Sequence, residues 1–442
     1  MRDDWQSLSA SNLGRAIGDG EIDPVELTEA YLQACGAHPD TDRIYTMLTP
    51  DRALAEARAA ALRTRSGLRH GLLDGVPISW KDLFDTAGLP TEAGSALLKG
   101  RVPAEDAEVL ARATRAGLVC LGKTHMTELA FSGLGLNPKT ATPPNVNDPD
   151  LVPGGSSSGA AASVAFGLAA AGIGSDTGGS VRLPAAYNDL VGLKTTHGRL
   201  SLKGVVPLAE SFDTVGPLTR TVEDAVHLLA VMESTKPVDL KGAHLSGKRF
   251  LVLEPYSSDV RDGPGAAFQS ALDRLGAAGA HIETGNVPAI DEAMQTTLML
   301  FTGEAYGTWG DVIEAAPEKM FDRIRERFRQ GREVSAPDFV AGWQRLRRLR
   351  QDWARETTAY DAVLLPTAAN LPAHAQRLMS DDAYFVAENL LTLRNTRVGN
   401  LMGLCGVTLP TGVPSTGIMI LCPPMAEPQL LRIAAAAEAV LA

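Results

Sequence analysis

A serine that follows two glycines is the residue of this chain best suited to nucleophilic chemistry. Residues 174–185 read GSDTGGSVRLPA, which places Ser180 directly after Gly178 and Gly179, with Asp176 and Arg182 nearby. Two glycines let the main chain approach a ligand closely and turn its N–H groups toward developing negative charge. The stretch is therefore typical either of a nucleophilic serine beside an oxyanion site or of a tight turn before a helix.

A nucleophilic serine needs a base, and the sequence offers a lysine for that role. None of the eight histidines lies in a catalytic signature, whereas GVPISWKDLFDTAG, residues 75–88, places Lys81 after an apolar run that predicts a buried strand. Desolvation lowers the pKa of a lysine from its usual value of about 10.4 toward neutrality. The alternative is a structural lysine that pairs with Asp82 or Asp85.

A second motif suggests a different nucleophile. Residues 155–159, GSSSG, satisfy the G-x-S-x-G pattern of the α/β-hydrolase nucleophile elbow, with Ser157 as nucleophile and Asp361 and His374 in the required order. An elbow joins a buried strand to a helix. The preceding TPPNVNDPDLVPG is typical of a loop, which disfavours this alternative.

The elements that must position these residues alternate along the chain. Apolar periodicity predicts helices near 24–36, 51–65, 105–117, 223–233, 265–278, 336–358 and 427–441. Short apolar runs predict strands buried on both faces at 75–79, 118–122, 249–254, 361–366 and 417–422. This alternation predicts an α/β fold with a central sheet in a single domain, residues 1–442, which begins with a helical part, residues 1–65.

A run of small residues separates the two serine–glycine loops. The stretch 159–173, GAAASVAFGLAAAGI, predicts one helix buried deep in the protein, where small side chains allow close approach. VPGGSSSG, residues 152–159, precedes it and the Ser180 stretch follows it. If the chain returns antiparallel to the helix, the two loops meet at one end of it.

The bulk composition indicates a folded protein in the cytoplasm. The net charge is −11, and we interpret the arginine-rich segment 345–350 as the solvated face of a helix, so no nucleic-acid surface is predicted. The amino terminus lacks the pattern of a secretory signal, and no run of 18 apolar residues occurs. The cysteines are far apart and predict neither a zinc site nor disulfides, but buried thiols: Cys35, Cys120, Cys405 and Cys422.

Several of these stretches together resemble the amidase signature family. They follow the family order from about residue 70 to the end of the chain, and Ser156 and Ser180 are 24 residues apart. The matching blocks are GVPISWKD (75–82), GKTHMTELAFSG (122–133), GGSSSGAAASVA (154–165), GSDTGGSVRLPAAYNDLVGLKTTHGRLS (174–201), SFDTVGPLTRTVED (211–224) and NLMGLCGVTLPTG (400–412).

The resemblance implies a hydrolase with a Ser–Ser–Lys triad on a mixed, twisted central sheet surrounded by helices. Ser180 resembles the acylated nucleophile, Ser156 the bridging serine, which lies in a cis peptide in the family, and Lys81 the base. The oxyanion hole would be formed by the backbone N–H groups of Thr177, Gly178, Gly179 and Ser180.

Other positions match the family's supporting residues or depart from them. Ser157 matches a residue that supports the triad by hydrogen bonding. Asp176 and Arg182 match positions that orient the loop or approach the substrate, with a loop-holding salt bridge as the alternative. Ser158 replaces a common glycine, and His125 replaces a frequent asparagine, so that it either touches the site or has a structural role.

The resemblance implies hydrolysis of a carboxamide to a carboxylate and ammonia or an amine through an acyl-enzyme. This reaction requires no metal or organic cofactor. The resemblance also implies a small amide substrate, no contact with nucleic acid or membrane, and a possible homodimer. The alternative is the glutaminase subunit of a tRNA-dependent amidotransferase that acts with a partner subunit. The short chain and the lack of a tyrosine-rich pattern in 300–360 disfavour it.

Substrate specificity in the family comes from variable segments, which correspond here to residues 132–150 and 265–395. The aromatic side chains in or next to these segments are either pocket walls or plain core: Phe131, Phe301, Tyr306, Trp309 and Trp343. Their clustered arginines either pair with a substrate carboxylate or are solvated: Arg323, Arg325, Arg327, Arg329 and Arg332.

Overall fold

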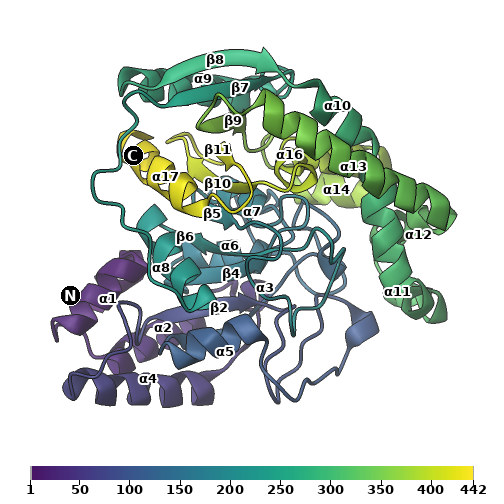
Figure 1. Ribbon diagram of the computed structural model, residues 1–442. Helices are drawn as coiled ribbons and strands as arrows, with labels where there is room; N and C mark the ends of the chain where they lie inside the picture. The colour runs from purple at the N-terminus through teal and green to yellow at the C-terminus, as the bar shows by residue number, and fades with distance from the viewer. Residues whose placement is uncertain (1, 442) are drawn as a thin grey trace.

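One mixed sheet runs through the whole molecule. The computed structural model describes residues 2–441, and its eleven strands follow the order β1-β3-β2-β4-β6-β5-β10-β11-β9-β7-β8 (Figure 1). β2 is parallel to β3 and β4, and β7 is parallel to β8 and β9, whereas the other neighbours are antiparallel. The strands are β1 (Tyr45–Leu48), β2 (Pro77–Lys81), β3 (Val119–Thr124), β4 (Ala171–Ser175), β5 (Val191–Lys194), β6 (Val215–Thr219), β7 (Arg249–Glu254), β8 (His281–Asn286), β9 (Ala362–Pro366), β10 (Cys405–Pro410) and β11 (Gly417–Cys422).

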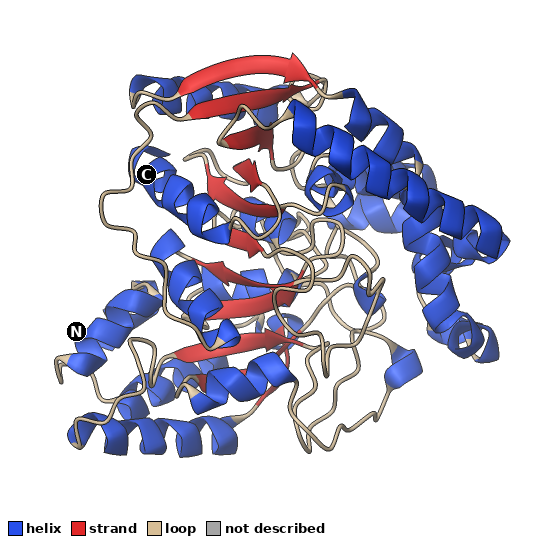
Figure 2. Ribbon diagram, viewed as in Figure 1, coloured by secondary structure: helices blue, strands red, loops and turns tan. Residues whose placement is uncertain are grey.

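Helices surround this sheet, and long loops gather along one side of it (Figure 2). Within residues 2–441, no helix is long and apolar enough to cross a membrane. The α-helices are α1 (Ala10–Gly18), α2 (Pro24–Ala37), α3 (Thr41–Ile44), α4 (Pro50–Arg65), α5 (Glu108–Arg115), α6 (Ser158–Ala165), α7 (Arg182–Tyr187), α8 (Val222–Glu233), α9 (Asp262–Ala277), α10 (Pro288–Gln295), α11 (Gly303–Ala315), α12 (Asp322–Arg329), α13 (Ala336–Glu356), α14 (Ala375–Ser380), α15 (Asp382–Arg394), α16 (Thr396–Leu401) and α17 (Glu427–Leu441).

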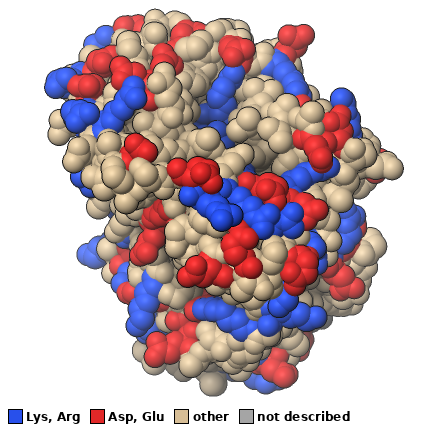
Figure 3. Space-filling model, turned by 90° about the vertical axis from the view of Figure 1, so that its right-hand side faces the viewer, with Lys and Arg blue, Asp and Glu red and all other residues tan. Residues whose placement is uncertain are grey.

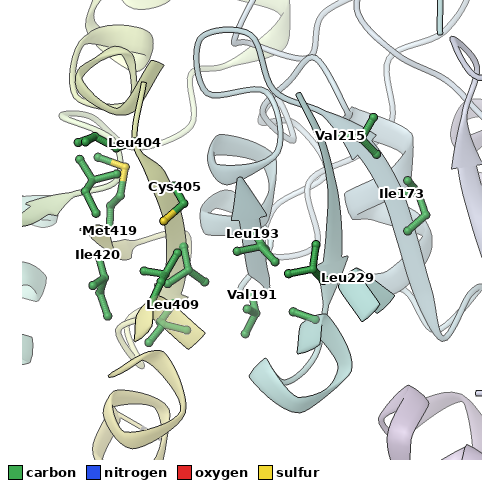
Figure 4. Close-up of a cluster of buried hydrophobic side chains, with 14 of the residues drawn as sticks. Ile173, Val191, Leu193, Val215, Leu229, Leu404, Cys405, Leu409, Met419 and Ile420 are labelled. Carbon is green, nitrogen blue, oxygen red and sulfur yellow. The ribbon is translucent and has the colours of Figure 1, made fainter. Parts of the chain in front are cut away.

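The core lies on the central strands of the sheet. Every residue of β2, β3, β4, β5 and β6 is buried, as expected for strands covered on both faces. Figure 4 shows the middle of this core, where apolar side chains of the sheet pack against one another and against α8. The labelled residues are Ile173, Val191, Leu193, Val215, Leu229, Leu404, Cys405, Leu409, Met419 and Ile420.

The predicted α/β fold is confirmed, but the small-residue stretch 159–173 is not one helix. α6 ends at Ala165, the chain turns at Gly167 with φ +73°, and β4 begins at Ala171. The small residues serve the packing of this helix on its own strand, because a Cβ on Gly172 would lie 2.7 Å from the carbonyl oxygen of Ala160. The chain does return antiparallel, so the two serine–glycine loops meet at one end.

Two further expectations concern charged and thiol side chains. Arg347 and Arg348 are exposed on α13, as the segment 345–350 predicted, but Arg350 turns inward and its Nε donates to the carbonyl oxygen of Leu401 at 2.6 Å. The prediction of a wholly solvated face is therefore wrong at this residue.

The prediction for the cysteines is confirmed: each is a free thiol and each is buried.

Candidate active site

Lys81 is the last residue of β2, and its amine is buried among hydroxyl groups. Nζ donates to Ser156 Oγ at 2.7 Å and to Ser175 Oγ at 2.8 Å. Burial lowers the pKa of Lys81 to about 7, although the charges of Asp213 and Asp176 act in the opposite direction. A large fraction of this amine is therefore neutral near pH 7 and able to accept a proton.

The sheet explains why these groups meet. β2 and β4 are parallel neighbours, with Trp80 opposite Ile173, so Lys81 and Ser175 leave the sheet at the same edge. In α/β sheets this carboxyl edge is where sites form. Ser175 was not among the predicted site residues, because it reaches the site through the pairing of β2 with β4, which no local sequence pattern contains.

The loop before α6 supplies the second hydroxyl. The peptide between Gly155 and Ser156 is cis, and Ser156 is fully buried. Gly155 has no room for a side chain, since a Cβ would lie 2.6 Å from Thr127 Oγ1. The carbonyl oxygen of Ser156 accepts from the N–H of Thr127 at 3.2 Å, which fixes the loop from the other side.

Ser157 joins this loop to the other two elements of the site. Its N–H donates to the carbonyl oxygen of Ser180 at 3.2 Å. Its Oγ donates to the carbonyl oxygen of Ser175 at 3.2 Å and accepts from the N–H of Ser175 at 3.3 Å. The structure thus brings Lys81, Ser156 and Ser180 into one cluster, with Ser157 at the junction.

Ser180 lines a cavity, in a loop with several unpaired backbone donors. Within residues 2–441, the N–H groups of Thr177, Gly178 and Ser180 have no hydrogen-bond acceptor. The N–H of Gly179 instead donates to Asp176 Oδ1 at 2.9 Å. Gly179 has φ +135°, a conformation that other residues rarely adopt. Three of the four N–H groups expected in the oxyanion hole are therefore free in this conformation.

Asp176 and Arg182 form a fully buried ion pair beneath this loop. Their closest approach is 2.9 Å, and Arg182 also donates to the carbonyl oxygen of Thr396 and to Asn400 Oδ1. Burial opposes ionisation of Asp176, but the charge and hydrogen bonds of Arg182 outweigh it and hold the pKa of this carboxyl well below its usual range. Neither side chain lines the cavity, so the pair has the loop-holding geometry.

Asp213 is a further buried carboxyl at the site and was not among the predicted site residues. Thr177 Oγ1 donates to it, and so does the N–H of Leu208 at 2.9 Å. Burial raises the pKa of Asp213, while the hydrogen bonds and the charge of Lys81 act in the opposite direction. Asp213 therefore ties the loop 176–180, which contains the N–H groups predicted to form the oxyanion hole, to the loop before β6. Its position in the block 211–224 was the available signal in the sequence.

Ser158 and His125, the two departures from the family pattern, are in contact with each other, and neither lines the cavity. Ser158 is the first residue of α6, and its Oγ donates to the carbonyl oxygen of His125 at 3.4 Å. The N–H of His125 donates to the carbonyl oxygen of Ile44, and burial lowers the pKa of the imidazole to about 4. His125 is neutral and does not line the cavity, which fits the structural alternative.

The residues of the nucleophile-elbow alternative are not assembled. No strand precedes Gly155 in residues 142–154. Asp361 Oδ1 accepts from Lys248 Nζ at 2.9 Å, and the backbone of His374 forms an isolated bridge with Leu151. The geometry therefore supports the lysine-based arrangement.

A cavity of about 820 Å³ opens above Ser180. Its walls include Phe131 and Phe301 among the aromatic residues singled out in the sequence, but not Tyr306, Trp309 or Trp343. Of the five clustered arginines, Arg323 and Arg327 line it. Arg397, which no sequence pattern identified, lines it as well. Within residues 2–441, no three His, Cys, Asp or Glu side chains are grouped so as to hold a metal ion.

Comparison with known proteins gives one consistent result. Residues 26–431 match the amidase family. The 2-amino-5-chloromuconic acid deaminase of Comamonas testosteroni is 33% identical, over 98% of this chain and 97% of that protein. A glutamyl-tRNA(Gln) amidotransferase subunit from Chloroflexus aurantiacus is 32% identical, over 96% of this chain and 95% of that protein. The crystal structure of an amidase superposes with a TM-score of 0.88 at 29% identity, covering 98% of this chain and 100% of that one.

Proposed function

The chain belongs to the amidase family of hydrolases, and from this we propose that Ser180 attacks a carboxamide and forms an acyl-enzyme with Lys81 as the base. One observation carries the proposal: a buried lysine whose pKa is lowered to about 7 lies 2.7 Å from Ser156 Oγ, in a loop bonded to Ser180. A lysine serves as general base only when its environment removes its proton near neutral pH.

The proposed reaction is a proton relay. Neutral Lys81 takes the proton of Ser156 as Ser156 takes that of Ser180, and Ser180 Oγ bonds to the amide carbon. The free N–H groups of Thr177, Gly178 and Ser180 stabilise the oxyanion, while Gly179, bonded to Asp176, shapes the loop. The relay returns the proton to the leaving nitrogen as the C–N bond breaks. Water then attacks the acyl carbon, which releases the carboxylate and restores Ser180.

We also propose how the rest of the chain is used. Residues 1–442 act as one domain, and the variable region 265–395 sets specificity, because most of the residues that line the cavity lie in this region, chiefly on α12, on α15 and in the turn 298–302. The substrate is a small amide, and the reaction as written uses no metal or organic cofactor. We place the enzyme in the cytoplasm, without nucleic acid or membrane as partner, and either alone or as a homodimer.

A second candidate is a glutaminase that delivers ammonia to a partner protein. The 32% identity to a subunit of a glutamyl-tRNA(Gln) amidotransferase supports it. The two candidates differ in what the purified chain does alone: a stand-alone amidase turns over its substrate without help, whereas a glutaminase that depends on a partner releases ammonia from glutamine only at a trace rate.

The test is ammonia release by the purified chain from aliphatic, aromatic and ureido amides and from glutamine, with Ser180→Ala as the control. Turnover that disappears in Ser180→Ala supports the proposal. Undiminished turnover in that variant would contradict it. Slow release from glutamine alone would favour the second candidate.

A further inference from the structure

Three arginines line the cavity above Ser180, and one of them, Arg323, is paired with Asp382. Arg327 belongs to α12 and Arg397 to α16, and both line the cavity together with Gly178 and Ser180. The stem of Arg397 lies against the oxyanion loop, since its Cγ is 3.9 Å from the point that a Cβ on Gly178 would occupy. Positive charge from two separate helices therefore converges on the space where the substrate must bind.

No carboxylate in the described part of the chain neutralises these two charges. Arg327 NH1 donates to the carbonyl oxygen of Phe131 at 3.0 Å, and its guanidinium lies over the ring of Phe131, 4.4 Å from the centroid. Within residues 2–441, neither Arg327 nor Arg397 forms a salt bridge. Over the same residues, the side chain of Arg397 forms no hydrogen bond either.

The two guanidiniums also oppose each other. Burial, and then the charge of Arg397, lower the pKa of Arg327 to about 9, and burial lowers the pKa of Arg397 to about 10. Both groups still carry a proton at neutral pH. Both side chains are half-buried, and a cation that is partly removed from water without a counter-ion is stabilised when an anion binds beside it.

The acidic side chains around the cavity are already engaged by other arginines. Asp322 Oδ1 accepts from Arg325 NH1 at 2.9 Å, and Glu326 accepts from both Arg325 and Arg329. Asp382 is bonded to Arg323. Figure 3, which views the side on which α11, α12 and α13 project in Figure 1, shows basic and acidic side chains intermingled on this surface. The rim is thus balanced in charge, whereas the interior is not.

Much of the remaining wall is formed by apolar side chains. Phe131, Phe301, Phe321, Phe385 and Leu393 line the cavity. Phe301 is held by stacking on Phe212, with 4.1 Å between ring centroids, and Phe131 packs on Phe328 at 4.6 Å. Such a wall suits a hydrocarbon body, and the two arginines suit a planar anion at one end of it.

We infer that the substrate of this enzyme is an amide that carries a carboxylate, a half-amide of a dicarboxylic acid with a short apolar body, whose free carboxylate is bound by Arg327 and Arg397. The inference rests on the proposed function, because the amide end must reach Ser180. It goes beyond that function by naming the substrate class and two residues that select it. Arginine binds a carboxylate through two parallel N–H donors, and an amide that carries no carboxylate lacks the matching pair of charged oxygens.

The first measurement compares two amides of equal length. Glutaramic acid ends in a carboxylate and pentanamide in a methyl group. We expect kcat/KM of the wild-type enzyme to be at least about 100-fold higher for glutaramic acid, and this ratio to fall about 100-fold in Arg327→Met and in Arg397→Met. Arg332→Met is the matched control, since Arg332 is exposed on the same segment and does not line the cavity. Its ratio should equal that of the wild type.

The second measurement does not depend on catalysis. Titration calorimetry with glutarate on Ser180→Ala should show binding that weakens at least about tenfold when Arg327→Met or Arg397→Met is added. Ser180-dependent turnover with equal preference for the two amides would overturn the inference and leave the proposed function standing. Arginine-dependent glutarate binding without turnover of any amide would sustain the carboxylate site and overturn the proposed function. An absence of both turnover and binding would overturn both.

Discussion

The floor and the wall of the cavity differ in whether their charged groups have partners within the protein. On the floor, which here includes the layer beneath Ser180 with Lys81, Ser156, Ser175 and residues 176–182, Asp176 is paired with Arg182 and the amine of Lys81 is held by two hydroxyl groups. In the wall, formed by residues 288–401, two guanidiniums face the cavity without a carboxylate. Groups that are already paired are held in place before the substrate arrives. Groups that lack a partner select the ligand that supplies one.

The largest effect should come from replacing Lys81, the proposed base. We expect Lys81→Met to lower kcat/KM by about 10³-fold or more, because neither Ser156 nor Ser180 can then lose its proton to a nearby amine. The matched control is Lys123→Met, in which an equally buried lysine on the adjacent strand β3 is lost. Lys123 pairs with Asp82 at 3.0 Å, so that variant should lose stability but keep the activity of its folded fraction.

The same lysine makes activity and stability depend on pH. With a pKa of about 7 in the folded protein, Lys81 should give a kcat/KM that rises through pH 7 and levels off above it. In the unfolded chain this lysine binds its proton up to about pH 10.4, so the free energy of unfolding should rise with pH between about 7 and 10. Thermal unfolding of Lys81→Met against the wild type, at several pH values, should show a difference that favours the variant more at pH 7 than at pH 10. A constant difference would show that Lys81 is charged in the folded protein.

A smaller effect is expected beneath the oxyanion loop. Asp176→Asn leaves Arg182 buried without its charge partner, which should lower the free energy of unfolding by about 3–5 kcal/mol. Because Asp176 also holds the N–H of Gly179, kcat should fall by about 100-fold, more than KM changes. Urea unfolding and steady-state kinetics measure both quantities.

Asp352→Asn is the control for that substitution. Asp352 pairs with Arg355 on the surface of α13, and its loss should cost less than about 1 kcal/mol. If Asp176→Asn were no more destabilising than this surface change, the ion pair of Asp176 with Arg182 would not hold the floor of the site in place.

Whether a site residue could be predicted from the sequence depends on how it reaches the site. Ser180 and Lys81 lie in short stretches whose residue types suit the proposed chemistry, so local patterns singled them out, whereas Ser156 was predicted only through the family resemblance. Ser175 and Arg397 reach the site through strand pairing and helix packing across long sequence separations, and no local pattern marks such contacts. Arg327 was noticed within a cluster of arginines, but only the structure shows that it lines the cavity and contacts Phe131 instead of a carboxylate.

The fold was predicted to a similar extent and for similar reasons. Strands with continuous apolar runs, such as β7 and β11, were identified within one residue of their bounds. The edge strand β8 was not, because its residues, HIETGN, are mostly exposed and lack an apolar run. Residues 171–173 were assigned to a helix, although they begin β4, since a glycine-rich buried strand and a small-residue helix have the same composition.

The smallest effect, and the sharpest contrast with the floor, should come from a change in the apolar wall. Phe301→Leu keeps an apolar side chain at the cavity but removes part of the surface that contacts the substrate body and the stacking on Phe212. We expect KM to rise about three- to tenfold with kcat within about twofold, because binding in the wall is equal in the ground state and the transition state. Phe268→Leu, a buried change in α9 away from the cavity, should cost similar stability and leave KM unchanged. If Phe301→Leu lowered kcat as strongly as Asp176→Asn, the wall would contribute to catalysis as well as to substrate binding, and the distinction between wall and floor would be wrong.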